Sequence, residues 1–446
     1  MYQIELVDSW PAGIPADVKE RIEKIIAWEI PHESTWYPQA GRTLVIRDEK
    51  SSVLIKVKGA GFFNPSGVSF SGTRRTTMPV PEGPVPIEPL QEAFQRDLIH
   101  VDPADEPPHR MESVHSTFAP VGGMTLQTAM NDQHIFAKLT SAGLPSNRPL
   151  ATYKYHELFL NEQQMGVSVA QLPANTLSIT PYNLYLAWQE AQIGSEAIDF
   201  FKGYTGNREF TLSNATHRLT ALAKLARVAG SLLIKFSTQA GLYRFSGSPD
   251  NWNIRFNTSE PFFFSDVDTS RSLDNILPAQ WGWEVLRNLI SAIHQWFYFF
   301  LPCLTYAESG YSASMLQERS HDFVRAILYG FFSESDQNIF DKTMEKMWQF
   351  FTPVLQTVEQ QSCVGLRTGE YELRKHYPRP VFYFVMLTLL SDMIQGSKFQ
   401  QAFSASDTTP EGIREYVKIS AEHSSHVHLF PEYSLSRLQD LIDAVK

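Results

Sequence analysis

The sequence predicts an α+β protein of two lobes, a small mixed lobe followed by a large helical lobe. The chain has 446 residues, which is two to three times the length of a typical domain of about 150 residues. Strand-like and helical patterns are mixed over residues 1–180, whereas helical periodicity prevails over residues 181–446. Apolar residues make up 43% of the chain, with 30 Phe and 17 Tyr, so the composition excludes a disordered protein.

The first 60 residues predict one helix and one β-hairpin. Apolar residues recur at helical spacing over 15–28. Residues 42–48 and 53–58 read as two strands joined by a polar turn. The second strand ends in Lys58-Gly-Ala-Gly, so we expect Lys58 to lie just before a sharp turn that glycine permits.

Residues 63–120 form a long segment rich in Pro, Gly, Ser and Thr. A structureless loop of that length is unusual inside a compact domain, so we interpret it as an insertion that carries short strands. A helix is predicted over about 126–142 and a strand over 148–155, which completes the mixed lobe.

The second lobe is predicted to be helical apart from one island. Helical periodicity is clear over Asn214–Ala240, Trp281–Tyr298, Ser314–Phe332, Phe340–Gln360, Val381–Gly396 and Ser434–Val445. The island, residues 241–270, holds the strand-like runs 252–256 and 261–264.

This island carries the residues best suited to chemistry. Asp250 and Asn251 precede the first strand-like run, and Asp266 and Asp268 follow the second. If the two runs form a hairpin, Asn251 and Asp266 lie at adjacent ends of it. Amide and carboxylate oxygens suit Mg²⁺, which takes one or two protein ligands beside nucleotide phosphates. With Lys58 in the first lobe, these are in outline the parts of a metal–nucleotide phosphotransferase.

Three segments resemble the selenoprotein O family of pseudokinase-like protein adenylyltransferases. Lys56-Val-Lys58-Gly-Ala-Gly is similar to the family's Leu-Lys-Gly-Ala-Gly strand. Gly241 to Asn251 matches its Gly-x(8)-Asp-Asn loop, and Gly123–Leu150 resembles its acidic helix and following strand. The resemblance implies a protein-kinase-like, two-lobed fold and the transfer of AMP from ATP to a protein hydroxyl, with Mg²⁺ or Mn²⁺.

The resemblance also implies a role for individual residues. Lys58 would hold the nucleotide phosphates, and Asp132 would orient that lysine. Asp250 would be the catalytic base or orienting carboxylate, while Asn251 and Asp266 would hold the metal.

The chain departs from the family pattern at several positions. The segment 63–120 is longer than its family equivalent and would contain the phosphate-binding arginines, for which Arg74 and Arg75 are candidates. Arg244-Phe245 stands where the family has His-Gly, and Gln133 replaces Asp132 under a different alignment.

Alternative assignments remain open within the same fold. Lys56 would replace Lys58 if the strand register differed by two, and Asp268 would replace Asp266 as the ligand. An ordinary kinase would use Asn253 as the metal amide, but its catalytic carboxylate would then fall on Ser248, which cannot accept the substrate proton in that way.

Net charge and cysteine content indicate which classes of partner and which cellular compartment to expect. A formal charge of −10 argues against a nucleic-acid partner, and no segment predicts a membrane span. Two cysteines, Cys303 and Cys363, are typical of a reducing, cytoplasmic setting. The expected partners are ATP and a protein or small-molecule acceptor. A phosphotransferase and an inactive pseudokinase scaffold are the alternative functions.

Overall fold

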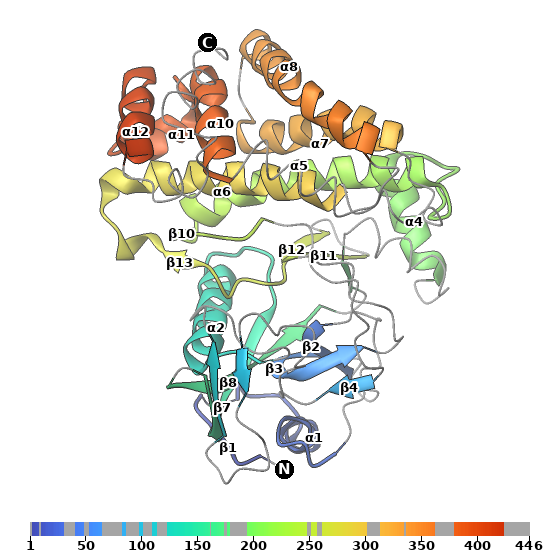
Figure 1. The fold of residues 1–446 in the computed structure, drawn as a ribbon. Coiled ribbons are helices and arrows are strands. Elements are labelled where there is room, and N and C mark those ends of the chain that lie inside the picture. Colours follow the sequence, from blue (N-terminus) through green and yellow to red (C-terminus); the bar gives the residue numbers. More distant parts are fainter. Residues whose placement is uncertain are drawn as a thin grey trace. The chain divides into compact units, whose positions relative to one another are not determined.

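The structure is a computed structural model that describes residues 2–8, 10–30, 41–48, 53–64, 83–85, 98–100, 109–113, 123–160, 162–173, 176–178, 194–247, 251–256, 261–300, 313–333, 336–361 and 379–422. The chain divides into two compact units (Figure 1). The first contains Met1–Leu177 and Phe263–Ser270, and the second contains Ser178–Phe262 and Arg271–Lys446. Residues 263–270 therefore return to the first unit, whereas the sequence predicted one change of lobe near residue 180.

The first unit is built on an eight-stranded sheet. Its strands are β1 (Ile4–Leu6), β2 (Gly41–Arg47), β3 (Leu54–Asn64), β4 (Gly83–Val85), β5 (Leu98–His100), β6 (His109–Ser113), β7 (Arg148–Leu160) and β8 (Gln163–Leu172). The order is β2-β3-β8-β7-β6-β5, with β1 paired to β7 and β4 paired to β3. All pairs are antiparallel except β6 with β7.

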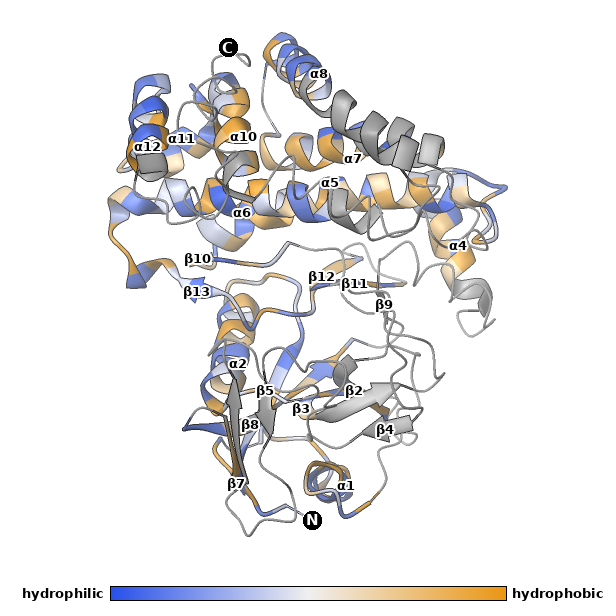
Figure 2. Cartoon of the chain, viewed as in Figure 1, coloured by the Kyte–Doolittle hydropathy of each residue, from blue (hydrophilic) through white to orange (hydrophobic). Residues whose placement is uncertain are grey.

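Helix α1 (Ala16–Ile26) covers one face of this sheet. Its apolar residues recur every three or four positions, so they form one stripe that packs on the strands. The shared core contains Val18, Ile22, Ile25 and Ile26 of the helix with Leu44, Ile46, Ile55, Val57, Val167 and Val169 of the sheet. Figure 2 shows that α1 also carries hydrophilic residues, as expected for a helix with one exposed side.

The opposite face of the sheet carries a buried polar row. Lys58 of β3, Ser168 of β8 and Thr152 of β7 are directly opposite one another, so their side chains share a face. Helix α2 (Leu126–Ser141) packs there, and Gln133 donates hydrogen bonds to Ser168 Oγ at 2.7 Å and to the Val169 carbonyl at 3.0 Å. The row is the part of the fold that positions the candidate site.

The sharp turn predicted after Lys58 is wrong, because β3 continues to Asn64. Gly59 has a φ of +100°, and the pairing of β2 with β3 shifts register between Gly41 and Thr43. A Cβ at Gly59 would lie 2.6 Å from Met124 Cγ. The glycine therefore provides a left-handed irregularity within a strand, which sequence alone does not distinguish from a turn.

The second unit is mainly helical. Its helices are α4 (Gly194–Thr205), α5 (Ala215–Thr238), α6 (Pro278–Phe300), α7 (Ala313–Phe331), α8 (Gln337–Gln361), α10 (Arg379–Ile394), α11 (Lys398–Ala402) and α12 (Pro410–Glu422), with a short 3₁₀ turn at Leu273–Asn275. Helices α5 and α7 cross so closely that a Cβ on Gly230 would clash with the Ile327 carbonyl, and a Cβ on Gly330 would clash with the Arg227 carbonyl.

Short strands accompany these helices. Strand β10 (Leu242–Tyr243) pairs antiparallel with β13 (Arg271–Ser272), and β11 (Trp252–Arg255) follows the loop after β10. The chain passes from the first unit to the second within strand β9 (Thr176–Ser178), and it returns to the first unit within strand β12 (Phe262–Phe264).

Most of the predicted elements that fall on described residues are confirmed. The first helix, the β2–β3 hairpin, α2, β7, the short strands of the island and the long helices α5, α6, α7, α8 and α10 are present. Strands β4, β5 and β6 confirm short strands within 63–120. Strand β8 and helices α4 and α12 were not predicted. The helix predicted over Ser434–Val445 lies outside the described residues.

No helix within the described ranges combines the length and the apolar character that crossing a membrane requires.

Candidate functional site

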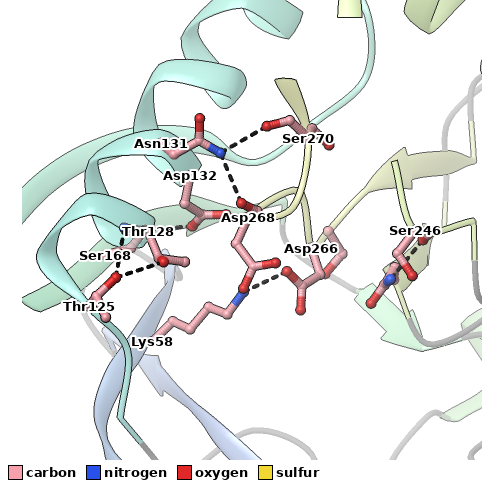
Figure 3. A network of polar contacts seen from close by, with 12 residues as sticks. Lys58, Thr125, Thr128, Asn131, Asp132, Ser168, Ser246, Asp266, Asp268 and Ser270 are labelled. Carbon is pink, nitrogen blue, oxygen red and sulfur yellow. Dashed lines mark hydrogen bonds and ion pairs between the residues drawn. The ribbon is translucent and has the colours of Figure 1, made fainter. Parts of the chain in front are cut away.

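The centre of the candidate site is a buried lysine between two carboxylates of the first unit. Lys58 Nζ lies 2.5 Å from Asp266 Oδ1 and 2.9 Å from Asp268 Oδ2 (Figure 3). The Lys58 side chain is 1% exposed, whereas those of Asp266 and Asp268 are 28% and 10% exposed. The ammonium is therefore desolvated and fixed, and the Asp266 carboxylate is the member of the group that most faces solvent.

Residues 265–270 are held against the sheet by hydrogen bonds to their backbone. Asn131 Nδ2 donates to the carbonyls of Asp268 and Ser270, at 2.9 and 3.0 Å (Figure 3). Lys56 Nζ donates to the Ser265 carbonyl at 2.5 Å, and Asn147 Nδ2 donates to the same oxygen at 3.1 Å. The two carboxylates are thus presented to Lys58 by anchored backbone on both sides.

Lys56 and Lys58 share a face of β3 but have different partners. They are two residues apart on the strand, so both point toward the α2 side. Lys56 is bonded to a carbonyl, while Lys58 is paired with two carboxylates. The two lysines therefore differ in their surroundings, and Lys58 is the one that lies between Asp266 and Asp268.

Asp132 lies on α2 beside the same polar row. Its Oδ2 accepts a hydrogen bond from Ser168 Oγ at 2.6 Å, and Ser168 is directly opposite Lys58 in the sheet. Its Oδ1 is buried with no hydrogen-bond partner in the described structure. Gln133, the alternative position, donates to Ser168 and to β8, so it joins the helix to the sheet.

Burial shifts the pKa values of two groups beside Lys58, the Asp132 carboxyl and the Lys56 ammonium. Burial raises the pKa of the Asp132 carboxyl, and the positive charges of Lys58 and Lys56 oppose that rise without cancelling it. Burial lowers the pKa of the Lys56 ammonium, against the attraction of Asp266. Both groups are therefore displaced toward their neutral forms.

Asn251 belongs to the second unit, at the start of β11. Its Nδ2 donates to the Ser246 carbonyl at 2.7 Å, which uses the amide nitrogen and orients the side chain. The preceding loop is anchored on α6, because Trp296 Nε1 donates to the Gly247 carbonyl at 3.0 Å and Asn288 Oδ1 accepts from the Arg244 amide at 2.8 Å. Arg244 has a φ of +61°, which is strained for a residue with a side chain.

Asn253, the metal amide of the alternative kinase register, lies within β11. Its side chain is 7% exposed, and its Oδ1 is buried without a hydrogen-bond partner in the described part of the chain. A buried amide oxygen without a partner is costly, so a ligand that reached this atom would offset that cost.

The structure brings Lys58, Asp132, Asp266 and Asp268 together within the first unit. Asp250, Arg74 and Arg75 lie outside the described residues, as do Ser248 and both cysteines. Sequence reasoning did not single out Asn131, Asn147 or Ser168. Asn131 could have been identified from its position next to Asp132 on a predicted helix. Ser168 could not, because it lies on strand β8, which was not predicted.

The oxygen donors of the cluster fit a magnesium ion whose remaining ligands are phosphate oxygens of a nucleotide. No set of three or more His, Cys, Asp and Glu side chains in the described ranges is arranged to hold a metal by itself. Mg²⁺ bound with a nucleotide uses only one or two protein carboxylates, and Asp266 and Asp268 provide two hard oxygen donors. These two residues would hold the ion.

Comparisons with known proteins give weak structural similarity and no sequence match. No protein-family model matches the chain, and no curated protein matches it. A matching solved structure, described as WaaP in complex with acyl carrier protein, is 13% identical over 50% of this chain and 76% of that chain, with a TM-score of 0.28. A TM-score of this size carries no conclusion about fold or activity.

Proposed function

We propose that this protein is an ATP- and Mg²⁺-dependent transferase that moves AMP onto a protein hydroxyl. The observation that supports this function is the buried Lys58 ammonium between the carboxylates of Asp266 and Asp268. A fixed cation beside two hard-oxygen donors is suited to a polyphosphate and its metal ion. The AMP specificity comes from the resemblance of Lys56–Gly61, Gly123–Leu150 and Gly241–Asn251 to the adenylyltransferase family.

The reaction requires charge neutralisation and positioning rather than a covalent enzyme intermediate. The acceptor hydroxyl oxygen attacks the α-phosphorus, the bond to the bridging oxygen breaks, and pyrophosphate leaves. Asp250 accepts the hydroxyl proton in this proposal. Lys58 binds phosphate oxygens, and the metal supplies further positive charge where negative charge develops.

Nucleotide binding would rearrange the contacts of Lys58. The ammonium already has two anionic partners, so phosphate oxygens must compete with Asp266 and Asp268 for its donors. A metal ion bound by these carboxylates would release the lysine toward phosphate, because the ion takes the same oxygens. We therefore expect nucleotide affinity to depend on the divalent cation.

Phosphoryl transfer is the second candidate, and one observation favours it. The buried Oδ1 of Asn253 has no hydrogen-bond partner in the described structure, and Asn253 is the metal amide of the ordinary kinase register. In that chemistry the acceptor oxygen attacks the γ-phosphorus, and ADP leaves.

The test uses the full chain with ATP labelled at either the α- or the γ-phosphate, with Mg²⁺ or Mn²⁺ and a mixture of candidate acceptor proteins. Retained α-label with released pyrophosphate supports AMP transfer, and retained γ-label supports the kinase. Asp266→Asn is expected to abolish transfer. Asp392→Asn, the same change at an exposed position of α10, serves as the matched control.

Absence of both labels, together with no ATP-dependent rise in melting temperature, would contradict a transferase and support a scaffold. Full activity of Asp266→Asn would show that this carboxylate holds no metal. Asn253→Asp and Asn251→Asp then distinguish the two registers, since the variant at the true ligand position alters the preference between Mg²⁺ and Mn²⁺.

A further inference from the structure

The second unit contains a groove between α5 and α7 whose rim is cationic. The groove has a volume of about 360 Å³, at the lower end of the range for ligand sites. Among the described residues, four cations and one carboxylate line it, a net charge of +3 in a chain whose net charge is −10, and the lining cation Arg325 pairs with Asp341 of α8 at 3.2 Å. These charged residues are Lys224, Arg227, Arg319, Asp322 and Arg325.

The cations are held in place by different contacts. Lys224 Nζ donates to the carbonyls of Tyr204 and Thr205 at 3.0 and 2.9 Å, at the C-terminus of α4. Arg319 pairs with Asp322 at 3.1 Å within α7. Exposed pairs of this kind contribute little stability and are open to a competing anion.

Arg227 is the cation best placed to bind an anion. Its guanidinium carbon lies 4.2 Å from the centroid of the Tyr329 ring. Stacking on an aromatic ring fixes the guanidinium plane while its N–H donors point along that plane, which suits bidentate binding of a carboxylate. In the described part of the chain, no carboxylate is paired with Arg227.

The wall between the cations is apolar. Ala223 of α5 and Ala326 of α7 are partly exposed in the lining, whereas Leu219 and Phe323, which also line it, are buried. The close glycine crossing at Gly230 and Gly330 sets the separation of the two helices, so the groove belongs to a rigid helix pair. A ligand with anionic ends and an apolar centre complements this surface.

We propose that the α5–α7 groove binds an acidic peptide segment of a partner protein, with an apolar side chain on the wall and carboxylates at Arg227 and its neighbouring cations. Single-stranded nucleic acid fits less well, because it requires open aromatic faces for base stacking. The face of Tyr329 is covered by the Arg227 guanidinium. The groove lies wholly in the second unit, so its function does not depend on the nucleotide site.

The test measures binding of a short fluorescent peptide of alternating Glu and Leu to the full chain by anisotropy. A peptide with Gln in place of Glu is the ligand control. Arg227→Glu is expected to weaken binding at least about tenfold, because it replaces a charge-assisted contact with repulsion. Arg414→Glu makes the same charge change on exposed α12 and should leave affinity unchanged.

Asp322→Asn removes the carboxylate found among the described lining residues and should strengthen peptide binding several-fold, a gain that a misfolded variant cannot produce. Lys58→Met should bind the peptide normally even if it no longer binds ATP, which separates this proposal from the proposed function. Unchanged affinity of Arg227→Glu, or equal affinity of the wild type for the Gln peptide, would overturn the proposal. Equally tight binding of a single-stranded oligonucleotide would also overturn it, in favour of a general polyanion surface.

Discussion

Lys56 and Lys58 form a natural matched pair at the residue scale. Both are buried on the same face of β3, but only Lys58 meets carboxylates. Lys58→Met leaves two carboxylates without their cation, so it should cost about 3 kcal/mol of stability and remove the ATP-dependent rise in melting temperature. Lys56→Met should keep that rise, since Asn147 still donates to the Ser265 carbonyl.

Two further variants separate binding from folding in this experiment. Lys58→Arg keeps the positive charge but changes the geometry of the donors, so it should recover stability more than nucleotide affinity. Lys58→Met combined with Asp268→Asn should recover part of the lost stability without recovering ATP binding. Loss of the nucleotide response in Lys56→Met and not in Lys58→Met would reverse the assignment of the two lysines.

Asp132 predicts a dependence of stability on pH. Its pKa is raised in the folded protein, so the folded state holds a proton on this carboxyl that the unfolded state releases above about pH 4. The contribution of Asp132 to stability is therefore present at low pH and is lost as pH rises toward its folded pKa. Asp132→Asn remains neutral and still offers an oxygen to Ser168.

We expect the melting temperature of Asp132→Asn to rise relative to that of the wild type as pH increases from about 4 to about 8. Melting curves across this range, with Asp392→Asn as an exposed control, measure the difference. A constant offset between Asp132→Asn and the wild type at all pH values would show that Asp132 is ionised in the folded protein throughout.

At the scale of elements, Gly59 is the position where β3 depends on a single residue. Its φ of +100° disfavours any side chain, and a Cβ there would also lie 2.7 Å from the Gly166 carbonyl of β8. Gly59→Ala should therefore destabilise the protein by about 1–3 kcal/mol and weaken nucleotide binding, because Lys58 is the adjacent residue. Urea unfolding and the ATP-dependent melting shift measure the two effects.

Gly203 of α4 provides the control for that substitution. A Cβ at Gly203 meets nothing within 4 Å, so Gly203→Ala should stabilise the helix by about 0.5–1 kcal/mol. If Gly59→Ala were as stable as Gly203→Ala, the strand irregularity at Gly59 would not be a constraint on the fold.

The elements that could be predicted from sequence have either a clear period or a short apolar run between polar residues. Helix α1 has one exposed side, so its apolar residues recur at helical spacing, whereas β2 is identified by the run Leu44-Val45-Ile46. Strand β8 was missed, although it lies in the same sheet as β3 and both faces of that sheet are covered by α1 and α2. Residues 165–170 of β8 are buried without interruption, and Gly166, Ser168 and Ala170, which alternate with its larger apolar residues, are small residues that do not mark a strand.

The candidate site divides in a similar way. Lys58, Asp266 and Asp268 could be identified because ionisable residues stand out beside glycine and apolar strands. Asn131 and Ser168 could not be, because their roles exist only once α2, β8 and residues 265–270 are packed together. The turn predicted after Lys58 failed for a local reason, since glycine with positive φ serves a turn and a strand irregularity equally well.

At the scale of the whole molecule, the net charge of the chain does not indicate which ligand either unit would bind. The value of −10 argues against a polyanion that covers a large surface. It does not describe the buried Lys58 in the first unit, or the groove in the second unit whose described lining residues carry a net charge of +3. Under both proposals, local charge that is placed by burial and by backbone contacts selects the anion of each unit.

The two units therefore predict two separable responses to ligands in hydrogen exchange. ATP with Mg²⁺ should slow exchange in β3, α2 and residues 263–270, because phosphate and metal order the groups around Lys58. The acidic peptide should slow exchange in α5 and α7 instead. Lys58→Met should lose the first response and keep the second, while Arg227→Glu should do the opposite. Protection of α5 and α7 by ATP in the absence of any change in β3 would move the nucleotide site to the second unit and leave the Lys58 cluster with a purely structural role.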